Sequence, residues 1–300
     1  MTRVLITGGH GFIGSHCIGP LQALGVEVHV VSRGNAAARS AETVHQLDLM
    51  DKEAARSLLQ RLRPSHLLHL AWVTEPGLFW NSPENRAWLD ASVALFEAFA
   101  ANGGKRFVGA GSCAEYDWSV PLLDEATTPL RPATPYGQAK NAAREQIEVK
   151  AKDFGVSFAW GRTFFLYGPG EKQGRLVGDV IRSLLRNQPV DTTEGLQILD
   201  YMHVADVGAA FASLTASEVQ GAVNIASGEA RPVYELLRIM GDITGRGELI
   251  RRGARPSAPE QPDRLEAVVT RLAREVGYLP RFSIEEGLRQ TVEHMKKAVC

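Results

Sequence analysis

The sequence predicts an α/β fold, a doubly wound parallel Rossmann sheet with a smaller, interleaved C-terminal substrate lobe. Short apolar runs that suit buried strands alternate with segments of helical periodicity from Val4 to Ile225. Three glycines at GxxGxxG spacing lie between the first of these strands and the first helix. Strands that alternate with helices form a parallel sheet covered on both faces, so both observations favour this fold class.

The expected elements follow in chain order. Strands are expected over 4–6, 26–31, 43–47, 66–71, 106–109, 157–160 and 222–225. Helices are expected over 12–24, 52–62, 83–101, 137–154, 176–186, 206–215 and 284–297. Gly19-Pro20 lies inside the first helix, where we expect a kink. Residues 246–263 are rich in Arg, Pro and Gly, which is typical of a loop.

The alternation ends after Gly170, so a second lobe is expected there. We assign residues 1–167 and about 197–226 to the dinucleotide-binding domain. Residues about 168–196 and 227–300 then form the smaller substrate-binding lobe.

The glycine-rich turn predicts a dinucleotide site. Gly8, Gly11 and Gly14 leave room for a tight turn and for a pyrophosphate to approach the backbone. The helix that follows begins with Phe12 and Ile13, and its N-terminus offers N–H groups and a positive dipole end to the phosphates. A glycine triplet at a strand-turn-helix junction is a much stronger signal than the triplet alone.

Bulk composition excludes several classes of protein. Lys plus Arg total 33 against 34 for Asp plus Glu, and this balance argues against a nucleic-acid or membrane-surface protein. The three cysteines are scattered, which suits a reducing cytosol, and no apolar run is long enough to span a bilayer. No His or Cys pattern has metal-ligand spacing. We therefore expect a cytoplasmic protein without a metal site.

Tyr136 and Lys140 are the candidate catalytic pair. They stand at i and i+4 of an expected helix, so they share one face. A neighbouring ammonium lowers the pKa of a phenol, and a phenol so tuned can exchange a proton with a carbonyl or carbinol. Ser112 follows the strand at 106–109, where its hydroxyl can hydrogen-bond the substrate oxygen beside that tyrosine.

These motifs resemble the extended short-chain dehydrogenase/reductases of the NAD-dependent epimerase/dehydratase family, which modify nucleotide sugars. The similarity runs almost end to end, through TGGHGFIG, HLA, GSCAEYD, YGQAK, RTFFLYGPGE, DYMHVADV and EEGL. It implies that Ser112, Tyr136 and Lys140 are catalytic and that Lys140 also holds the nicotinamide ribose. It implies further cofactor contacts at Asp48, Leu49, Leu70, Ala71 and Thr163. Hydride transfer at the nicotinamide and a homodimer are also expected from the resemblance.

Three positions depart from the family pattern. Ser32 and Arg33 follow the second strand, where NAD-preferring members usually carry an Asp, so NADP(H) is favoured and NAD(H) stays open. Phe165 and Leu199 stand where many members carry the Asn and Arg that grip a nucleotide diphosphate. Cys113-Ala114 replaces the Asp-Glu pair of the sugar 4,6-dehydratases, so no dehydratase activity is expected.

Four residues are candidates for substrate contacts, namely Trp72, Ser112, Glu115 and Arg175. Trp72 lies just beyond a strand's carboxyl end, which favours a pocket wall over core packing. Trp80 and Trp88 suit either role. Glu115 faces either the substrate or the solvent, and Arg175 either replaces the missing diphosphate grip or is solvated.

The leading hypothesis is an NADP(H)-dependent reductase of a keto group on a sugar-like substrate, with a nucleotide-linked 4-keto-deoxysugar as the favoured class. A nucleotide-sugar C4 epimerase with tightly bound NAD is the alternative within the family. A dinucleotide-sensing scaffold without catalysis is the alternative from another class, although the set Ser112, Tyr136 and Lys140 argues against it.

Overall fold

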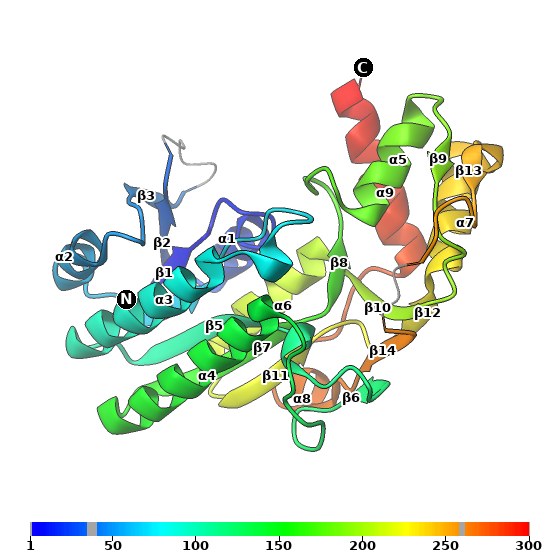
Figure 1. The fold of residues 1–300 in the computed structure, drawn as a ribbon. Coiled ribbons are helices and arrows are strands. Elements are labelled where there is room, and N and C mark those ends of the chain that lie inside the picture. Colours follow the sequence, from blue (N-terminus) through cyan, green and yellow to red (C-terminus); the bar gives the residue numbers. More distant parts are fainter. Residues whose placement is uncertain (1, 35–40, 258–261, 300) are drawn as a thin grey trace.

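A seven-stranded parallel sheet forms the centre of the larger lobe (Figure 1). The computed structural model describes residues 2–34, 41–257 and 262–299. The strand order is β11-β7-β5-β4-β1-β2-β3, with Val4 of β1 opposite Val28 of β2 and His66 of β4. The strands are β1 (Arg3–Thr7), β2 (Glu27–Ser32), β3 (Thr43–Gln46), β4 (His66–His69), β5 (Arg106–Ser112), β7 (Ser157–Thr163) and β11 (Gly221–Ile225). The doubly wound fold is thereby confirmed, and the order of the strands reverses between β1 and β4.

Helices cover both faces of this sheet. Successive side chains of a strand point to opposite faces, so Leu5 and Leu67 pack in one core and Ile6 and Leu68 in another. The first core lies under α2 (Lys52–Leu62), α3 (Glu84–Ala101) and α4 (Pro135–Phe154), and the second under α1 (Ser15–Ala23) and α6 (Val204–Ala216).

The smaller lobe is built around a second sheet, whose order is β12-β10-β14-β6, with β8 also paired to β10. Its strands are β6 (Leu122–Leu123), β8 (Phe165–Tyr167), β10 (Ile198–His203), β12 (Ala230–Pro232) and β14 (Arg264–Ala267). Its apolar core lies between α5 (Leu176–Leu185), α7 (Val233–Thr244) and α9 (Ile284–Val299). Because β6, β8 and β10 all precede β11 of the larger sheet along the chain, the lobes are interleaved. The residue boundaries between the two domains stay a prediction.

Several elements differ from those expected. α1 begins at Ser15 instead of residue 12, because Phe12 and Ile13 belong to the glycine-rich turn. Pro20 lies inside this helix, as expected. The segment 246–263, expected as loop, includes η3 (Gly247–Leu249) and β13 (Ile250–Arg251), which pairs with β9 (Val190–Asp191). The sequence analysis missed α7, although its buried residues recur at helical spacing. It also missed α8 (Thr270–Arg274). Across the described ranges, no helix combines the length and apolar character needed to cross a bilayer.

Gly8 and Gly14 close the turn between β1 and α1. Gly8 has a φ of +68°, and a Cβ added to it would lie 2.9 Å from the backbone nitrogen of Ala71. A Cβ on Gly14 would lie 2.2 Å from the carbonyl oxygen of Gly8. The backbone there is too close to its neighbours for any side chain, as a phosphate-binding turn requires.

Gly8→Ala is expected to weaken dinucleotide binding at least tenfold, because the added methyl group must displace the chain at Ala71. Gly25→Ala is the matched control, since Gly25 also has a positive φ of +72° but open space around its Cβ position. It should cost about 1 kcal/mol of folding stability and leave cofactor affinity unchanged. Titration calorimetry of both variants checks this, and equal affinities would contradict it.

Candidate active site

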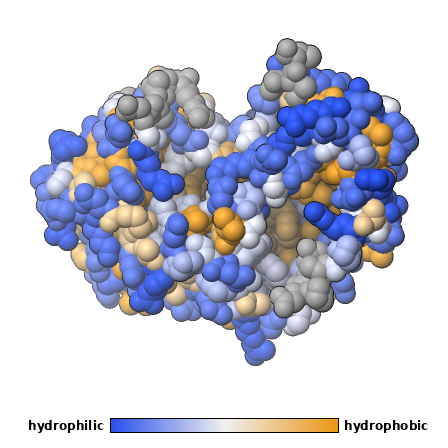
Figure 2. All heavy atoms as spheres, turned by 45° about the horizontal axis from the view of Figure 1, so that its top comes forward, coloured by the Kyte–Doolittle hydropathy of each residue, from blue (hydrophilic) through white to orange (hydrophobic). Residues whose placement is uncertain are grey.

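A cavity of about 800 Å³ opens between the two lobes at the carboxyl edge of the parallel sheet. Figure 2 shows the molecule hollowed between its two halves, with apolar surface inside the hollow. The cavity begins at the glycine-rich turn and ends among residues of β8, β10 and α5. A crevice at the point where strand order reverses is the usual ligand site of open α/β sheets.

The first half of the cavity suits a dinucleotide. It is lined by the predicted residues Gly8, Gly11, Phe12, Ile13, Gly14, Ser32, Arg33, Leu49, Leu70, Ala71 and Thr163. The turn leaves a cradle that a Cβ would fill, and the N-terminus of α1 opens onto it. Asp48 is exposed outside this lining, and its carboxylate accepts the N–H of Met50 at 3.0 Å. An adenine contact by Asp48 therefore stays a prediction.

Ser112 and Tyr136 line the same cavity, although they belong to different elements, a strand and a helix. Ser112 is the last residue of β5, and Tyr136 is the second residue of α4, whose N-terminus is capped by the Thr134 hydroxyl. The tyrosine ring is held edge-on between two aromatic rings, with centroids 4.9 Å from Phe79 and 5.6 Å from Trp80. The sheet edge and the helix start thus bring the serine and the tyrosine to one cavity.

Lys140 lies one turn along α4 but is aimed away from the phenol. Its Nζ donates to the Ala110 carbonyl at 2.8 Å and lies 3.9 Å from the centroid of the Trp72 ring. The distance from Nζ to the centroid of the Tyr136 ring is 6.0 Å. Burial lowers the pKa of Lys140 to about 7, and the charge of Glu115 opposes that shift. The ammonium is therefore held by a carbonyl and an indole face.

The expected lowering of the Tyr136 pKa by Lys140 is wrong. Burial raises the pKa of Tyr136 above its usual value, and a hydrogen bond with the Ser112 side chain opposes the shift only in part. Desolvation penalises the phenolate, and the lysine is not oriented to offset that penalty. The phenol is protonated at neutral pH.

Glu115 does not face the substrate, so that expectation is corrected. Its side chain is fully buried and forms an ion pair with Arg162 at 2.8 Å. Its other oxygen accepts the Ser112 backbone N–H at 2.8 Å and the Trp160 indole N–H at 2.9 Å. A buried carboxylate needs such partners. Glu115 therefore fixes the backbone of Ser112 from inside the fold.

The remaining candidates take distinct places. Trp72, Trp80 and Trp88 all line the cavity, although Trp72 and Trp88 are also buried in the core. Arg175 lines it too, with its guanidinium 5.1 Å from the centroid of the Phe79 ring. Phe165 lines the cavity, whereas Leu199 is buried among the apolar residues of the second sheet. Burial raises the pKa of the Cys113 thiol to about 12, so packing is its role.

His10 and Glu171 are among the cavity residues that were not predicted from the sequence. The Nε2 atom of His10 lies 3.3 Å from Oε1 of the buried Glu42. The Glu171 carboxylate accepts the Gly178 N–H at 2.7 Å, and burial raises its pKa to about 7. His10 stands within the glycine motif and Glu171 ends the RTFFLYGPGE motif, so both could have been singled out from the sequence.

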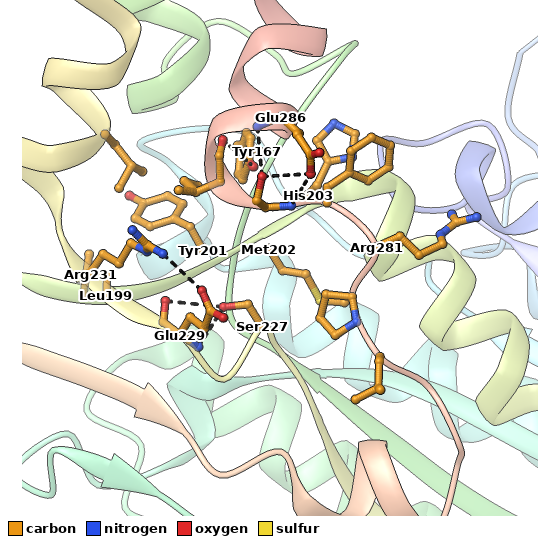
Figure 3. A pocket seen from close by; sticks show the side chains of 16 residues that line it. Tyr167, Leu199, Tyr201, Met202, His203, Ser227, Glu229, Arg231, Arg281 and Glu286 are labelled. Carbon is orange, nitrogen blue, oxygen red and sulfur yellow. Dashed lines mark hydrogen bonds and ion pairs between the residues drawn. The ribbon is translucent and has the colours of Figure 1, made fainter.

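A second cavity, of about 530 Å³, lies in the smaller lobe between β10 and the segment before α9. Figure 3 shows hydrogen bonds and ion pairs between several of the polar side chains that line it. Arg231 pairs with Glu229 at 3.2 Å, and Ser283 donates to Glu286 at 2.8 Å. The glycine turn, Ser112 and Tyr136 all belong to the first cavity, so we place the active site there.

Comparison with known proteins assigns the family. The model of the NAD dependent epimerase/dehydratase family matches residues 4–226. The chain belongs to this family. It is therefore an enzyme of the short-chain dehydrogenase/reductase type, within a family that modifies nucleotide sugars, and its cofactor is a nicotinamide dinucleotide.

Individual relatives catalyse different reactions. The GDP-6-deoxy-D-mannose reductase of Pseudomonas aeruginosa is 25% identical over 316 residues, which cover 99% of this chain and 98% of the relative. The UDP-glucose 4-epimerase GEPI48 of Cyamopsis tetragonoloba is 25% identical over 331 residues, covering 95% and 93%. The structure of Thermus thermophilus UDP-glucose 4-epimerase in complex with NAD has a TM-score of 0.85 and 26% identity, covering 99% and 100%.

His69 supports the corner between the glycine turn and Ala71. Its Nδ1 lies 2.7 Å from the Thr7 hydroxyl, which also accepts the Ala71 N–H at 3.3 Å. Its Nε2 lies 2.8 Å from the Ser92 hydroxyl. Burial, reinforced by the charge of Lys140, lowers the pKa of His69 to about 3. The imidazole is thus neutral in the folded protein.

Acidification is expected to destabilise the protein through His69. Between about pH 6.5 and pH 3 the unfolded chain binds a proton that the folded chain does not, so stability falls as the pH falls. The loss attributable to this group is about 2 kcal/mol at pH 5. His69→Asn should be less stable at pH 7.5 yet lose less on going to pH 5, as urea unfolding would show. Exposed His294, changed to Asn, should keep the native slope.

Proposed function

We propose that this protein is an NADP(H)-dependent ketoreductase of a sugar substrate, with a nucleotide-linked 4-keto-deoxysugar as the favoured class. The end of β2 carries the proposal. Ser32 and Arg33 line the cavity there. Among the described residues numbered 10 to 49, none of those that line the cavity is acidic. A guanidinium matches the geometry of a phosphate, so this end suits the 2′-phosphate of NADP(H).

The protonated phenol supports reduction. A bound nicotinamide would supply the hydride that reduces the keto carbon. Ser112 and Tyr136 line the same cavity, and in the proposed reaction the Ser112 hydroxyl hydrogen-bonds the keto oxygen while Tyr136 gives that oxygen its proton. The alcohol then carries both new hydrogens, one on carbon from the hydride and one on oxygen from Tyr136, and the phenolate that remains takes up a proton from solvent before the next turnover. An acid that starts protonated suits this direction, since alcohol oxidation needs a base first.

Arg175 supports an anionic substrate. Its guanidinium lines the cavity and stacks on Phe79, and no carboxylate of the described residues forms an ion pair with it. The neighbouring cations are committed, Lys172 to Glu75 at 3.0 Å and Arg182 to Asp179. We infer that Arg175 binds the substrate's diphosphate in place of the grip missing at Phe165 and Leu199. The reductase among the relatives acts on a nucleotide-linked deoxysugar by its name.

The alternative within the family is a nucleotide-sugar C4 epimerase with tightly bound NAD. It is favoured by the 4-epimerases among the relatives and by the neighbour solved with NAD. The nucleotide content of the purified protein distinguishes the two functions. An epimerase should retain NAD(H) through purification, whereas a reductase should be purified without it and bind added NADPH. A homodimer and a cytoplasmic location stay predictions for this chain.

Tyr136→Phe is expected to lower turnover of the keto sugar by about 10² to 10⁴ with cofactor affinity unchanged, because only the proton donor is removed. Tyr167→Phe is the matched control, since Tyr167 is a buried tyrosine whose hydroxyl donates to the Ile284 carbonyl in the smaller lobe. Steady-state kinetics with NADPH and the keto sugar check this. Near-normal turnover of the Tyr136 variant would refute the acid assignment.

NADPH is expected to bind at least tenfold tighter than NADH, and Arg33→Ala should remove most of that difference. A charge-assisted hydrogen bond to a phosphate contributes about 1.5 to 3 kcal/mol, which is the loss expected for NADPH alone. Arg238→Ala, on the exposed face of α7, is the control. Dissociation constants from fluorescence titration decide the matter, and equal constants in the unmodified protein would favour the epimerase.

A further inference from the structure

Asn85, in the first turn of α3, has a fully bonded and buried side chain. It is 2% exposed, and its Oδ1 accepts the indole N–H of Trp72 at 2.9 Å. Its Nδ2 donates to the carbonyls of Phe79 at 2.7 Å and Ser82 at 3.0 Å. One amide therefore joins the segment after β4 to the turn η1 (Phe79–Asn81). Both segments lead to catalytic candidates.

The first branch leads to Lys140. The Trp72 ring, anchored through its N–H by Asn85, presents its face to the lysine Nζ at 3.9 Å from the ring centroid. The Trp72 ring is also stacked on Trp88, with centroids 6.2 Å apart and planes 29° from parallel. An indole face attracts an ammonium, and more strongly when both are removed from water. The orientation of Trp72 thus fixes where the ammonium is favourable.

The second branch leads to Tyr136. Two bonds from the Asn85 amide fix the backbone on either side of η1, which carries Phe79 and Trp80. The rings of both residues meet Tyr136 edge-on, at interplanar angles of 88° and 86°. These edge-to-face contacts limit the directions in which the phenol can point.

We propose that Asn85 is a positioning residue that sets the side chains of both Tyr136 and Lys140 through this aromatic layer. The catalytic roles of that pair rest on the proposed function, but the arrangement itself does not. Replacing the amide would release the indole from Lys140 and the turn from Tyr136 at the same time.

The charged groups around Lys140 are either paired or neutral, so the position of Trp72 can influence the pKa of the lysine. Glu115 lies nearby but is bound by Arg162, and His69 is neutral across the range of interest. Tyr136 is protonated at neutral pH, and the Ala110 carbonyl is the direct hydrogen-bond acceptor of Nζ. The indole face of Trp72 is then the main element whose placement can be changed without altering a charge.

Competitive acylation of Lys140, followed by mass spectrometry across pH 5 to 10, measures its titration without substrate. In Trp72→Leu the pKa of Lys140 should move by about 0.5 to 1.5 units from its native value, because the variant loses the cation–π contact and changes the burial of the ammonium. Asn85→Ala should shift it in the same direction, with a smaller change in Trp72→Phe, which keeps a ring face. Asn102→Ala, at the other end of α3, removes a comparable hydrogen bond from a side-chain amide to the Ala98 carbonyl. This variant should leave the titration of Lys140 unchanged.

The pH profile of turnover gives the second readout. Asn85→Ala should lower kcat about tenfold or more through misplacement of the acid, and move the profile in parallel with the Lys140 titration. A native titration of Lys140 in Asn85→Ala would overturn the proposal, whatever Trp72→Leu shows. If Asn85→Ala does not fold, Asn85→Gln replaces it, because the longer side chain keeps the amide but displaces it from Trp72, Phe79 and Ser82. Because acylation needs no substrate, its result stands even if the protein reduces no keto sugar.

Discussion

The close approach of the β1–α1 turn to the chain leaving β4 is the constraint on which the site depends. There is no space for a Cβ between Gly8 and Ala71, so two backbone segments on either side of the point of strand reversal lie in contact. The Thr7 side chain stabilises this contact through two hydrogen bonds, one with His69 and one from the backbone N–H of Ala71. The cofactor half of the cavity opens directly above the corner, and the order of the strands places β5 and α4 beside it.

Buried polar groups support the candidate catalytic residue Ser112 from inside the fold. Glu115 and Arg162 form an ion pair within the larger lobe, and the carboxylate binds the backbone of Ser112. An ion pair in such a place costs desolvation and is favourable only when its remaining hydrogen bonds are satisfied. Here the Trp160 indole and the Tyr116 hydroxyl provide those partners. The strand end that carries Ser112 is therefore rigid without any contact from substrate.

An aromatic layer buries most of the surface of Tyr136 and Lys140, the candidate catalytic pair. Phe79 and Trp80 meet Tyr136, and Trp72 covers Lys140. The resulting burial explains why the pKa of the phenol is raised and that of the lysine is lowered, both of which favour the uncharged forms. Across the cavity, Arg175 reaches Phe79 from the smaller lobe, so this layer also joins the two halves of the molecule.

The sequence by itself determined the fold class, and it predicted many of the residues that line the first half of the cavity. Strand-turn-helix alternation and glycine spacing are local patterns, and β1, β2, β4 and β5 must end at one sheet edge once they are parallel. Ser112 and Tyr136 were found in this way. Only the tertiary structure decided that Glu115 is an internal partner of Arg162 and that Asn85 joins Trp72 to Phe79. Side-chain direction and burial depend on residues far apart in sequence, and the pKa of Tyr136 follows from that burial, so no local pattern contains them.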